Sequence, residues 1–397
     1  MACEVRKQQP SGPLPVILRS HVLWYWLLVS PALLLAILGL LGERKRIQYV
    51  SQRLTETPAA LPPATIIVPV KGDDEGLRQN LAALASQNYP DYELIIVAHS
   101  AADIPPGVLP RSVKIVLANG ADPDTGEKVQ NLQAAIHAVR KRSEIFAFAD
   151  SDGRPTRGWL RALAAPLAEE GVGASTGYRW FMPYPATFWS LMRGVWDAVA
   201  LGRLGPGDCA FAWGGAMAIR KETFYAARVN EHWKNTVSDD YALSAAIRAA
   251  GLTIAFAPGA LTPSFERLPC ARFFAWIRRQ MTITRVYNPR LWRLGLVAHI
   301  FYCAAMCASI VECLHGYLPA VVALAAQLVP GMLKGWNRAA LARQALPEYA
   351  TWFRRYAWTH AIFTPIATWV WLIALASSTA GNSIEWRGRR YHLRRVR

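Results

Sequence analysis

The chain is poor in charged residues, and acidic residues are the scarcest of them. Charged residues make up only 18% of its 397 positions while hydrophobic residues make up 53%, an unusual balance for a soluble protein. The 27 acidic and 44 basic residues give a formal net charge of +17. Such a balance indicates nucleic acid, anionic lipid or an anionic substrate as a partner. The basic residues lie beside apolar segments and no known nucleic-acid-binding motif is present, so we expect a lipid bilayer and no nucleic acid.

Paired cysteines are also missing from the sequence. None of the six cysteines forms a C-x-x-C pair, and three of them lie in one apolar stretch. We interpret them as reduced structural residues, which agrees with a catalytic domain in the cytoplasm.

An uncharged apolar run of spanning length covers residues 22–42, after a basic segment at residues 1–21. The run lacks a clear small-residue cleavage site, which favours a retained anchor over a signal peptide. Basic residues flank it on both sides, but the tighter cluster follows it and favours a cytoplasmic domain after the anchor.

The chain becomes apolar again in the region 294–377, before a basic tail at 384–397. Three full spans here would put the arginine-rich tail on the opposite side of the membrane from the catalytic domain. We therefore expect one candidate to be re-entrant or interfacial, and Pro330 and Gly331 make the middle one the weakest. The candidate spans are 294–314, 317–333 and 357–377.

Residues 61–285 predict one α/β domain, because short apolar runs alternate there with segments of helical spacing. Helices are expected at Leu77–Gln87 and Val129–Arg142. This alternation is typical of a doubly wound sheet, in which ligands bind at the carboxyl ends of the strands. The predicted strands are Thr65–Val70, Tyr92–Val97, Val113–Leu117 and Ile145–Ala149.

The acidic group Asp150-Ser151-Asp152 directly follows the last of these strands. Two carboxylates at a strand end suit Mg²⁺ or Mn²⁺, which would neutralise the charge on a departing diphosphate. The same residues are also compatible with an ordinary turn after a strand.

A second acidic pair, Asp239-Asp240, lies 87 residues beyond Asp152. Asp240 is a candidate general base that would deprotonate an acceptor hydroxyl. Ser238 or Asp239 is also a good N-cap for the helix expected at Tyr241–Ala250. The two interpretations are compatible, because a cap fixes a base at a helix start.

Three other residues are candidates for contact with a charged ligand. Gly214 and Gly215 would let the backbone pass close to a ligand, or would make a tight turn into a strand. Lys128 offers an anion contact, or lies at a solvated helix start.

Two segments near the apolar region leave alternatives open. The cations and amide of Arg278–Arg285 fit a diphosphate clamp, a lipid headgroup contact or a plain juxtamembrane basic cluster. Pro185–Gly202 has the spacing of an amphipathic interface helix or of a core helix.

Taken in order, these segments resemble the family 2-type inverting glycosyltransferases. They are most similar to the ceramide glucosyltransferase branch, which includes bacterial lipid glucosyltransferases of the hopanoid type. The matching segments are Val68–Gly72, Gln87–Pro90, Tyr92–Leu94, Lys128–Leu132, Asp150–Asp152, Gly214–Arg220, Asp239–Tyr241 and Ile384–Gly388.

The resemblance implies a GT-A fold with a doubly wound mixed sheet, a UDP-sugar donor such as UDP-glucose, Mg²⁺ or Mn²⁺, and inversion at the anomeric carbon. It implies Asp240 as the base and Asp150 with Asp152 as metal ligands. The donor contacts implied are Lys128, Asp150, Asp103 and Gly72. The contacts implied for the acceptor lipid or the diphosphate are Gly214, Gly215, Arg279, Gln280, Arg285 and Trp386.

The chain departs from the branch at two places. Ser100 stands where the branch has an acid after its second strand, with Asp103 the nearest acid, which puts recognition of the uridine in doubt. The branch's Q/R-x-x-R-W segment is degenerate at Arg279–Ile283, although Arg285 is one turn further on.

The sequence thus predicts a multi-pass integral membrane hexosyltransferase, with its catalytic domain on the cytoplasmic side of a bacterial inner membrane. It would transfer a hexose, with glucose the expected sugar, to the hydroxyl of a ceramide, a hopanoid or a glycerolipid. One alternative is a polyprenyl-phosphate sugar synthase, whose anionic acceptor needs no base. The other is a catalytically degenerate membrane scaffold, for which the missing acid at Ser100 argues.

Overall fold

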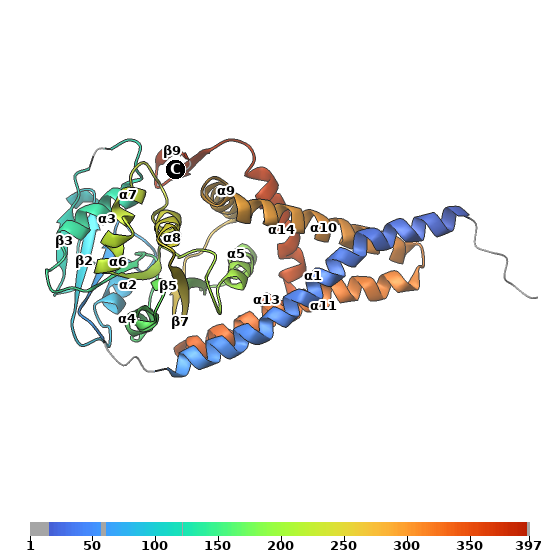
Figure 1. The fold of residues 1–397 in the computed structure, drawn as a ribbon, viewed down its shortest axis with the longest axis horizontal. Helices are drawn as coiled ribbons and strands as arrows, with labels where there is room; N and C mark the ends of the chain where they lie inside the picture. The colour runs from blue at the N-terminus through green and yellow to red at the C-terminus, as the bar shows by residue number, and fades with distance from the viewer. Residues whose placement is uncertain (1–15, 57–60, 121, 395–397) are drawn as a thin grey trace, which may run out of the picture.

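The computed structural model describes residues 16–56, 61–120 and 122–394, with side chains from residue 22 onward. An α/β domain lies at one end of the molecule and long helices extend away from it at the other (Figure 1). Most of the basic segment at residues 1–21 and the last three residues of the tail therefore lie outside the described structure.

Seven strands form one mixed sheet in the order β3-β2-β1-β4-β6-β5-β7. Only β6 runs antiparallel to its neighbours, β4 and β5. The four strands predicted from the sequence are all present, with ends shifted by no more than one residue. The strands are β1 Ala64–Pro69, β2 Tyr92–Ala98, β3 Lys114–Leu117, β4 Ile145–Ala149, β5 Val172–Phe181, β6 Ala216–Arg220 and β7 Thr253–Ser264.

Helices cover both faces of the sheet, so its central strands are buried on both sides and are apolar throughout. Ile67 and Phe148 face α3 (Glu127–His137) and α8 (Asp239–Ala249), whereas Ile66 and Ala147 face α2 and α4. Each strand thus contributes alternate residues to two cores. The other domain helices are α2 Leu77–Leu84, α4 Trp159–Ala164, α5 Phe188–Ala198, α6 Lys221–Ala226, α7 Val229–His232 and α9 Cys270–Tyr287.

Within the described residues, three helices are long and apolar enough to cross a bilayer: α1 (Val16–Thr55), α10 (Pro289–Leu314) and α11 (Leu318–Ala345). The anchor expected at 22–42 is the first part of α1, which continues beyond it as one helix to Thr55. Val50, in this continuation, belongs to the same core as the central strands. The helix therefore joins the apolar bundle directly to the α/β domain.

The expectation that 317–333 is the weakest span is wrong. This segment forms one unbroken helix with the basic residues that follow it, although Pro330 lies inside it. The candidate at 357–377 is divided instead into α13 (Thr359–Ile362) and α14 (Thr364–Ser377). The 14 residues of α14 span about 21 Å, which is shorter than the roughly 30 Å of a bilayer core.

Figure 1 shows α14 running across the direction of α1, α10 and α11 rather than along it. Gly335 of α11 lies against the backbone carbonyl of His360 in α13, where any Cβ would overlap that oxygen. A small residue is therefore needed at position 335 for α11 and α13 to approach each other. This contact lies just before the point where the chain is divided into α13 and α14.

The tail forms a two-stranded hairpin of β8 (Ser383–Trp386) and β9 (Arg389–His392). Ile384 and Leu393 of the hairpin share an apolar cluster with Val237 and Val286 of the α/β domain. The tail and the domain must therefore lie on the same side of any membrane. The described cysteines, at 209, 270, 303, 307 and 313, are all unpaired.

Candidate active site

The two strand-end carboxylates Asp150 and Asp152 lie at the carboxyl edge of the sheet, directly after β4. Arg179 of β5 lies between them and donates to both, at 3.0 Å from Asp150 Oδ2 and 3.0 Å from Asp152 Oδ1. This guanidinium thus holds the two carboxylates in a fixed relation.

Lys128 enters the same cluster from the first turn of α3. Its Nζ donates to Asp150 Oδ1 at 2.9 Å and lies 3.1 Å from Asp239 Oδ2. Only 13% of the lysine side chain is exposed, so the alternative of a solvated helix start is wrong. Lys128 joins the acidic group after β4 to the acidic pair at the start of α8.

Asp240 occupies the first turn of α8, where Ser238 is the N-cap. Its Oδ2 accepts a hydrogen bond from the Gly214 N–H at 3.3 Å, and its Oδ1 accepts from the Ser238 hydroxyl. Ser238 therefore caps the helix and positions the Asp240 carboxylate at the same time. These contacts orient the carboxylate, which is half-buried, toward the cavity described below.

Gly214 and Gly215 lie where the chain passes between these acids. A Cβ on Gly214 would lie 2.5 Å from Asp239 Oδ2, and one on Gly215 would lie 2.2 Å from the Trp213 ring and 2.7 Å from Asp150 Oδ2. Any side chain here would displace the carboxylates, so these glycines allow the close approach and do more than make a turn.

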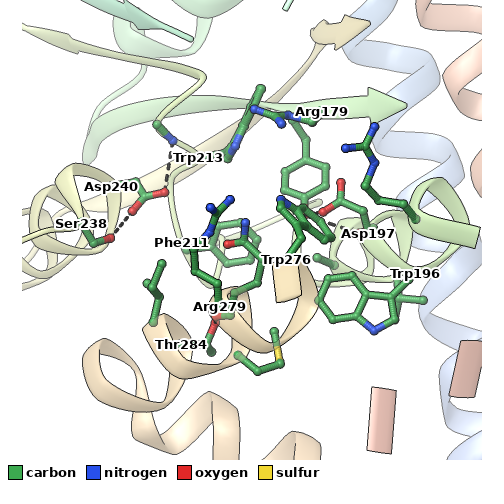
Figure 2. A pocket seen from close by; sticks show the side chains of 18 of the residues that line it. Arg179, Trp196, Asp197, Phe211, Trp213, Ser238, Asp240, Trp276, Arg279 and Thr284 are labelled. Carbon is green, nitrogen blue, oxygen red and sulfur yellow. Dashed lines mark hydrogen bonds between the residues drawn. The ribbon is translucent and has the colours of Figure 1, made fainter. Parts of the chain in front are cut away.

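A cavity of about 1230 Å³ joins this cluster to the long helices. At one end its wall includes Lys128, Asp150 and Asp240, and at the other it includes Leu38 of α1 and Leu294 of α10. In Figure 2, Asp240 and Ser238 lie on one side of the cavity, Asp197 and Trp196 on the other, and Arg279 points into it from α9. The volume lies above the roughly 300–1,000 Å³ of ordinary small-molecule pockets.

The sequence model of glycosyl transferase family 21 matches residues 25–397, which is nearly the whole chain. The chain belongs to glycosyl transferase family 21. The family and the mixed sheet together confirm the GT-A type of fold that the sequence predicts.

Solved structures of other glycosyltransferases are similar at low identity. A mannosyltransferase from Pyrobaculum calidifontis, in complex with GDP-Man and Mn²⁺, is 18% identical with a TM-score of 0.47, over 87% of this chain and 99% of that one. Glucosyl-3-phosphoglycerate synthase from Mycobacterium tuberculosis, in complex with Mn²⁺, UDP and glucosyl-3-phosphoglycerate, is 16% identical with a TM-score of 0.40, over 56% of this chain and 79% of that one. No curated protein matches the chain.

Several residues predicted for the site of this family 21 glycosyltransferase come together in one place. Arg279 and Gln280 of α9 line the cavity, and the Arg279 guanidinium lies 6.0 Å from the centre of the Trp386 ring. With the residues already described, these form one continuous wall. The predicted site residues on or against that wall are Lys128, Asp150, Asp152, Gly214, Gly215, Asp240, Arg279, Gln280 and Trp386.

Three predicted residues have other partners. Asp103 accepts from the backbone N–H and hydroxyl of Ser100, so it caps a short turn and does not line the cavity. Gly72, with a φ of +71°, donates its N–H to the carbonyl of Asp103. Arg285 donates to Gly381 O and to Asn382 Oδ1, and thus holds the loop before the tail hairpin. Local spacing did not reveal these bonds.

The hairpin supplies a cation that the sequence interpretation did not assign. Arg387 donates to Asp74 Oδ1 at 2.6 Å and to Lys71 O at 2.8 Å, in the loop after β1. Arg389 lies 3.0 Å from Glu127, which also pairs with Lys71. The resemblance of Ile384–Gly388 to the family implied only Trp386 as a site residue, although Arg387 is part of the same segment.

Arg179 and Asp197 were also missed, because each lies among mostly apolar residues. Asp197 of α5 lines the cavity and accepts a hydrogen bond from the Tyr178 hydroxyl at 3.2 Å. Burial raises the pKa of Asp197 to about 7, although Arg179 opposes this rise. The only sequence signal was polarity within an otherwise buried segment.

Burial and charge move the pKa values of the carboxylates apart. Burial favours a higher pKa for Asp150, but the charges of Lys128 and Arg179 outweigh it and hold that pKa below its usual range. For Asp152, burial and the charges of Asp150 and Asp74 raise the pKa to about 6 despite Arg179. The cluster therefore favours added positive charge.

The helix α5 proves to be a core helix. Met192, Val195 and Trp196 are buried against α9 and α14, and the Trp196 ring stacks on Trp371 at 4.3 Å. It thus lies between the catalytic cavity and the apolar bundle.

Proposed function

We propose that this family 21 glycosyltransferase transfers a hexose, glucose in particular, from a UDP-sugar to the hydroxyl of a membrane lipid with inversion at the anomeric carbon. The observation that supports this best is the single cavity, which connects the carboxylate cluster to helices of membrane-spanning length. A soluble donor and a lipid acceptor can therefore meet without the lipid leaving the bilayer.

The donor end of the cavity suits a divalent cation with its diphosphate. No group of three or more His, Cys, Asp or Glu side chains in the described part of the chain could hold a metal alone. Asp150 and Asp152 nevertheless offer carboxylate oxygens, the ligand type of Mg²⁺ and Mn²⁺, although Arg179 pairs with both carboxylates in this structure. Bound there, either ion would offset charge on the departing diphosphate.

Asp240 is the proposed general base. Its two oxygens are oriented by Gly214 N–H and the Ser238 hydroxyl, and it faces the same cavity as the metal pair. It would accept the proton of the lipid hydroxyl as the hydroxyl oxygen attacks the anomeric carbon and the bond to the diphosphate breaks. Attack from the face opposite the leaving group gives inversion. Lys128 would keep Asp150 and Asp239 in place during the exchange.

Three spans, α1, α10 and α11, agree with the position of the tail. After α1 the catalytic domain lies on one side, α10 leaves that side and α11 returns to it. The basic tail then lies beside the domain, as its contacts with Asp74 and Glu127 require. We infer that this side is cytoplasmic, because arginine-rich segments favour that side.

The direct test is an incubation of membranes containing the full chain with labelled UDP-glucose and, separately, labelled UDP-galactose. Ceramide, a hopanoid, a diacylglycerol and a polyprenyl phosphate are supplied as acceptors, and extracted lipids are analysed by mass. We expect a hexosyl lipid formed at a hydroxyl group. Product on the polyprenyl phosphate alone would favour the sugar-phosphate synthase, and no product with any acceptor would refute the proposal.

The scaffold alternative is tested by metal-dependent binding of UDP to the purified protein. We expect binding that requires Mg²⁺ or Mn²⁺ and that weakens in Asp152→Ala, because one of the two ligands is lost. Asp208→Asn, at an exposed position beside Arg248, is the control. Unchanged titrations in Asp152→Ala would disprove the ligand assignment.

A further inference from the structure

Four charged side chains line the cavity at its membrane end, where α1 and α11 leave their apolar segments. Glu43 and Arg46 come from α1, and Lys334 and Arg338 come from α11. The apolar run of α1 ends at Gly42 and that of α11 ends at Leu333, and the two helices lie side by side in the same direction (Figure 1). Both charged pairs therefore lie at the same level, at the boundary between the apolar and polar parts of the molecule.

The two residues of α1 have partners within the protein. Arg46 donates to Gly202 O at 2.7 Å and to Leu204 O at 3.1 Å, and it pairs with Glu43 Oε1. This arginine thus attaches α1 to the segment after α5, and its charge is balanced by Glu43.

The two cations of α11 have no such partners. Neither Lys334 nor Arg338 makes a hydrogen bond or an ion pair with any residue in the described part of the chain, and Arg338 Nε is buried without an acceptor. Arg338 is only 8% exposed. The lysine lies across the bare backbone of α1, where a Cβ on Gly39 would be 2.7 Å from its Nζ.

Electrostatics favours an anion at this place. Like charges four residues apart on a helix repel, and a buried charge without a partner is costly. Glu43 Oε2 is a buried acidic oxygen without a hydrogen bond to any described residue, but Glu43 already balances Arg46. One negative charge therefore faces three positive charges, and the site carries an excess of positive charge.

We propose that Lys334 and Arg338 bind the phosphate of an anionic membrane lipid at the membrane end of the cavity. Leu38 and Leu294 line the same cavity and provide apolar surface for an acyl chain, which a free phosphate would not need. Glu43 and Arg46 are the charges that act on Arg338, whereas the carboxylates of the catalytic cluster are not among them. The site is thus separate from the donor end, and it does not depend on which lipid is the acceptor.

Native mass spectrometry of the full-length protein in detergent tests the proposal, with phosphatidylglycerol and phosphatidylcholine titrated separately. We expect one tightly bound phosphatidylglycerol, preferred over phosphatidylcholine by about tenfold or more. Both lipids offer a phosphate for charge-assisted contacts, but the choline group of phosphatidylcholine would bring a positive charge beside the two cations. Lys334→Gln with Arg338→Gln should remove this preference. Arg44→Gln with Lys45→Gln removes two exposed charges from the same level of α1 and should leave the preference unchanged.

Thermal unfolding separates loss of the site from loss of the fold. Phosphatidylglycerol should raise the midpoint of the wild type and of Lys334→Arg with Arg338→Lys, but not that of the double glutamine variant. The glutamine variant without lipid should unfold at or above the wild-type midpoint, since it loses two unpaired cations. Retention of the bound phosphatidylglycerol by the folded glutamine variant would overturn the proposal. An equal shift with inorganic phosphate alone would overturn the assignment to a lipid.

Discussion

Asp240→Asn tests the proposed chemistry with little change to the structure around it. Asp240 Oδ1 accepts from the Ser238 hydroxyl and the Tyr241 N–H, whereas Oδ2 accepts from the Gly214 N–H at 3.3 Å. An asparagine keeps one acceptor oxygen and loses the other. If its oxygen keeps the Oδ1 contacts, only the long bond from Gly214 is lost, at a cost of about 1 kcal/mol in stability.

The effect on the reaction should be much larger than the effect on the fold. Removal of a positioned base typically lowers the rate about 10²–10⁴-fold, which corresponds to roughly 3–5.5 kcal/mol in the activation free energy. Asp240 makes no contact with Asp150 or Asp152, so metal-dependent binding of UDP should change by less than about twofold. Steady-state transfer to a lipid hydroxyl and UDP titration, measured on the same preparation, provide both quantities.

Asp208→Asn makes the same chemical change on the exposed surface and should leave both measurements unaltered. Wild-type rates in Asp240→Asn would refute the assignment of the base. Full transfer to a polyprenyl phosphate with none to a hydroxyl would show that the enzyme uses the anionic acceptor. A loss of UDP binding as large as the loss of rate would place Asp240 among the donor contacts instead.

Three further predictions follow from individual contacts. Gly215→Ala should abolish metal-dependent UDP binding, because its Cβ would lie 2.2 Å from the Trp213 ring and 2.7 Å from Asp150 Oδ2; titration with UDP measures this. Asp197→Asn should unfold at a higher temperature than the wild type, and the difference in unfolding midpoint should grow from about pH 4 to about pH 7. Burial raises the folded-state pKa of Asp197 to about 7, so the wild type loses stability as the pH rises through this window, by at most about 4 kcal/mol. Arg387→Gln should raise the KM for the donor by about fivefold, because a partly exposed ion pair beside the cluster contributes about 1 kcal/mol.

Each of these changes has a matched control. Gly158→Ala places a Cβ where no atom lies within 4 Å, and it should bind UDP normally. The unfolding difference for Asp197→Asn should vanish below about pH 4, where aspartate is protonated in both states, and a constant difference at all pH values would contradict the assigned pKa. Arg390→Gln removes an exposed charge from the same hairpin without breaking an ion pair with a described residue. An equal rise in KM for this variant would mean that overall tail charge matters, not the contact with Asp74.

The sheet was predictable because each of its strands can be recognised from its own short run of apolar residues. Ile145–Ala149 is entirely apolar, and a strand buried on both faces requires this composition. The acids that follow it then had to lie at the carboxyl edge of the sheet. The same reasoning placed Asp240 at a helix start, because Ser238 is a good cap whatever the rest of the fold does.

Contacts between distant segments could not be predicted in this way. Arg179 bridges Asp150 and Asp152 only because β5 is brought beside β4 by the antiparallel strand β6 between them. Arg387 is more than 300 residues from Asp74, and its position depends on the packing of the tail hairpin against α9. Spacing along the chain contains no information on such neighbours.

The spans show the same division. Hydropathy identified the apolar segments. The presence of Pro330 and Gly331 then made 317–333 the weakest candidate span. In the folded protein α11 is continuous, and the segment at 357–377 is broken where α13 packs on Gly335. Composition measures the preference of a segment for lipid, whereas its length as one helix is decided by packing.

The sequence by itself determined the elements, the acids at the strand and helix ends, and the family, because each depends on residues close together in the chain. Only the tertiary structure decided which charges meet. It placed Arg179 between two aspartates, held Arg387 against the loop after β1 and left Lys334 and Arg338 without an acidic partner among the described residues. Electrostatic energy depends on separation in space, and the path of the chain alone brings these groups together.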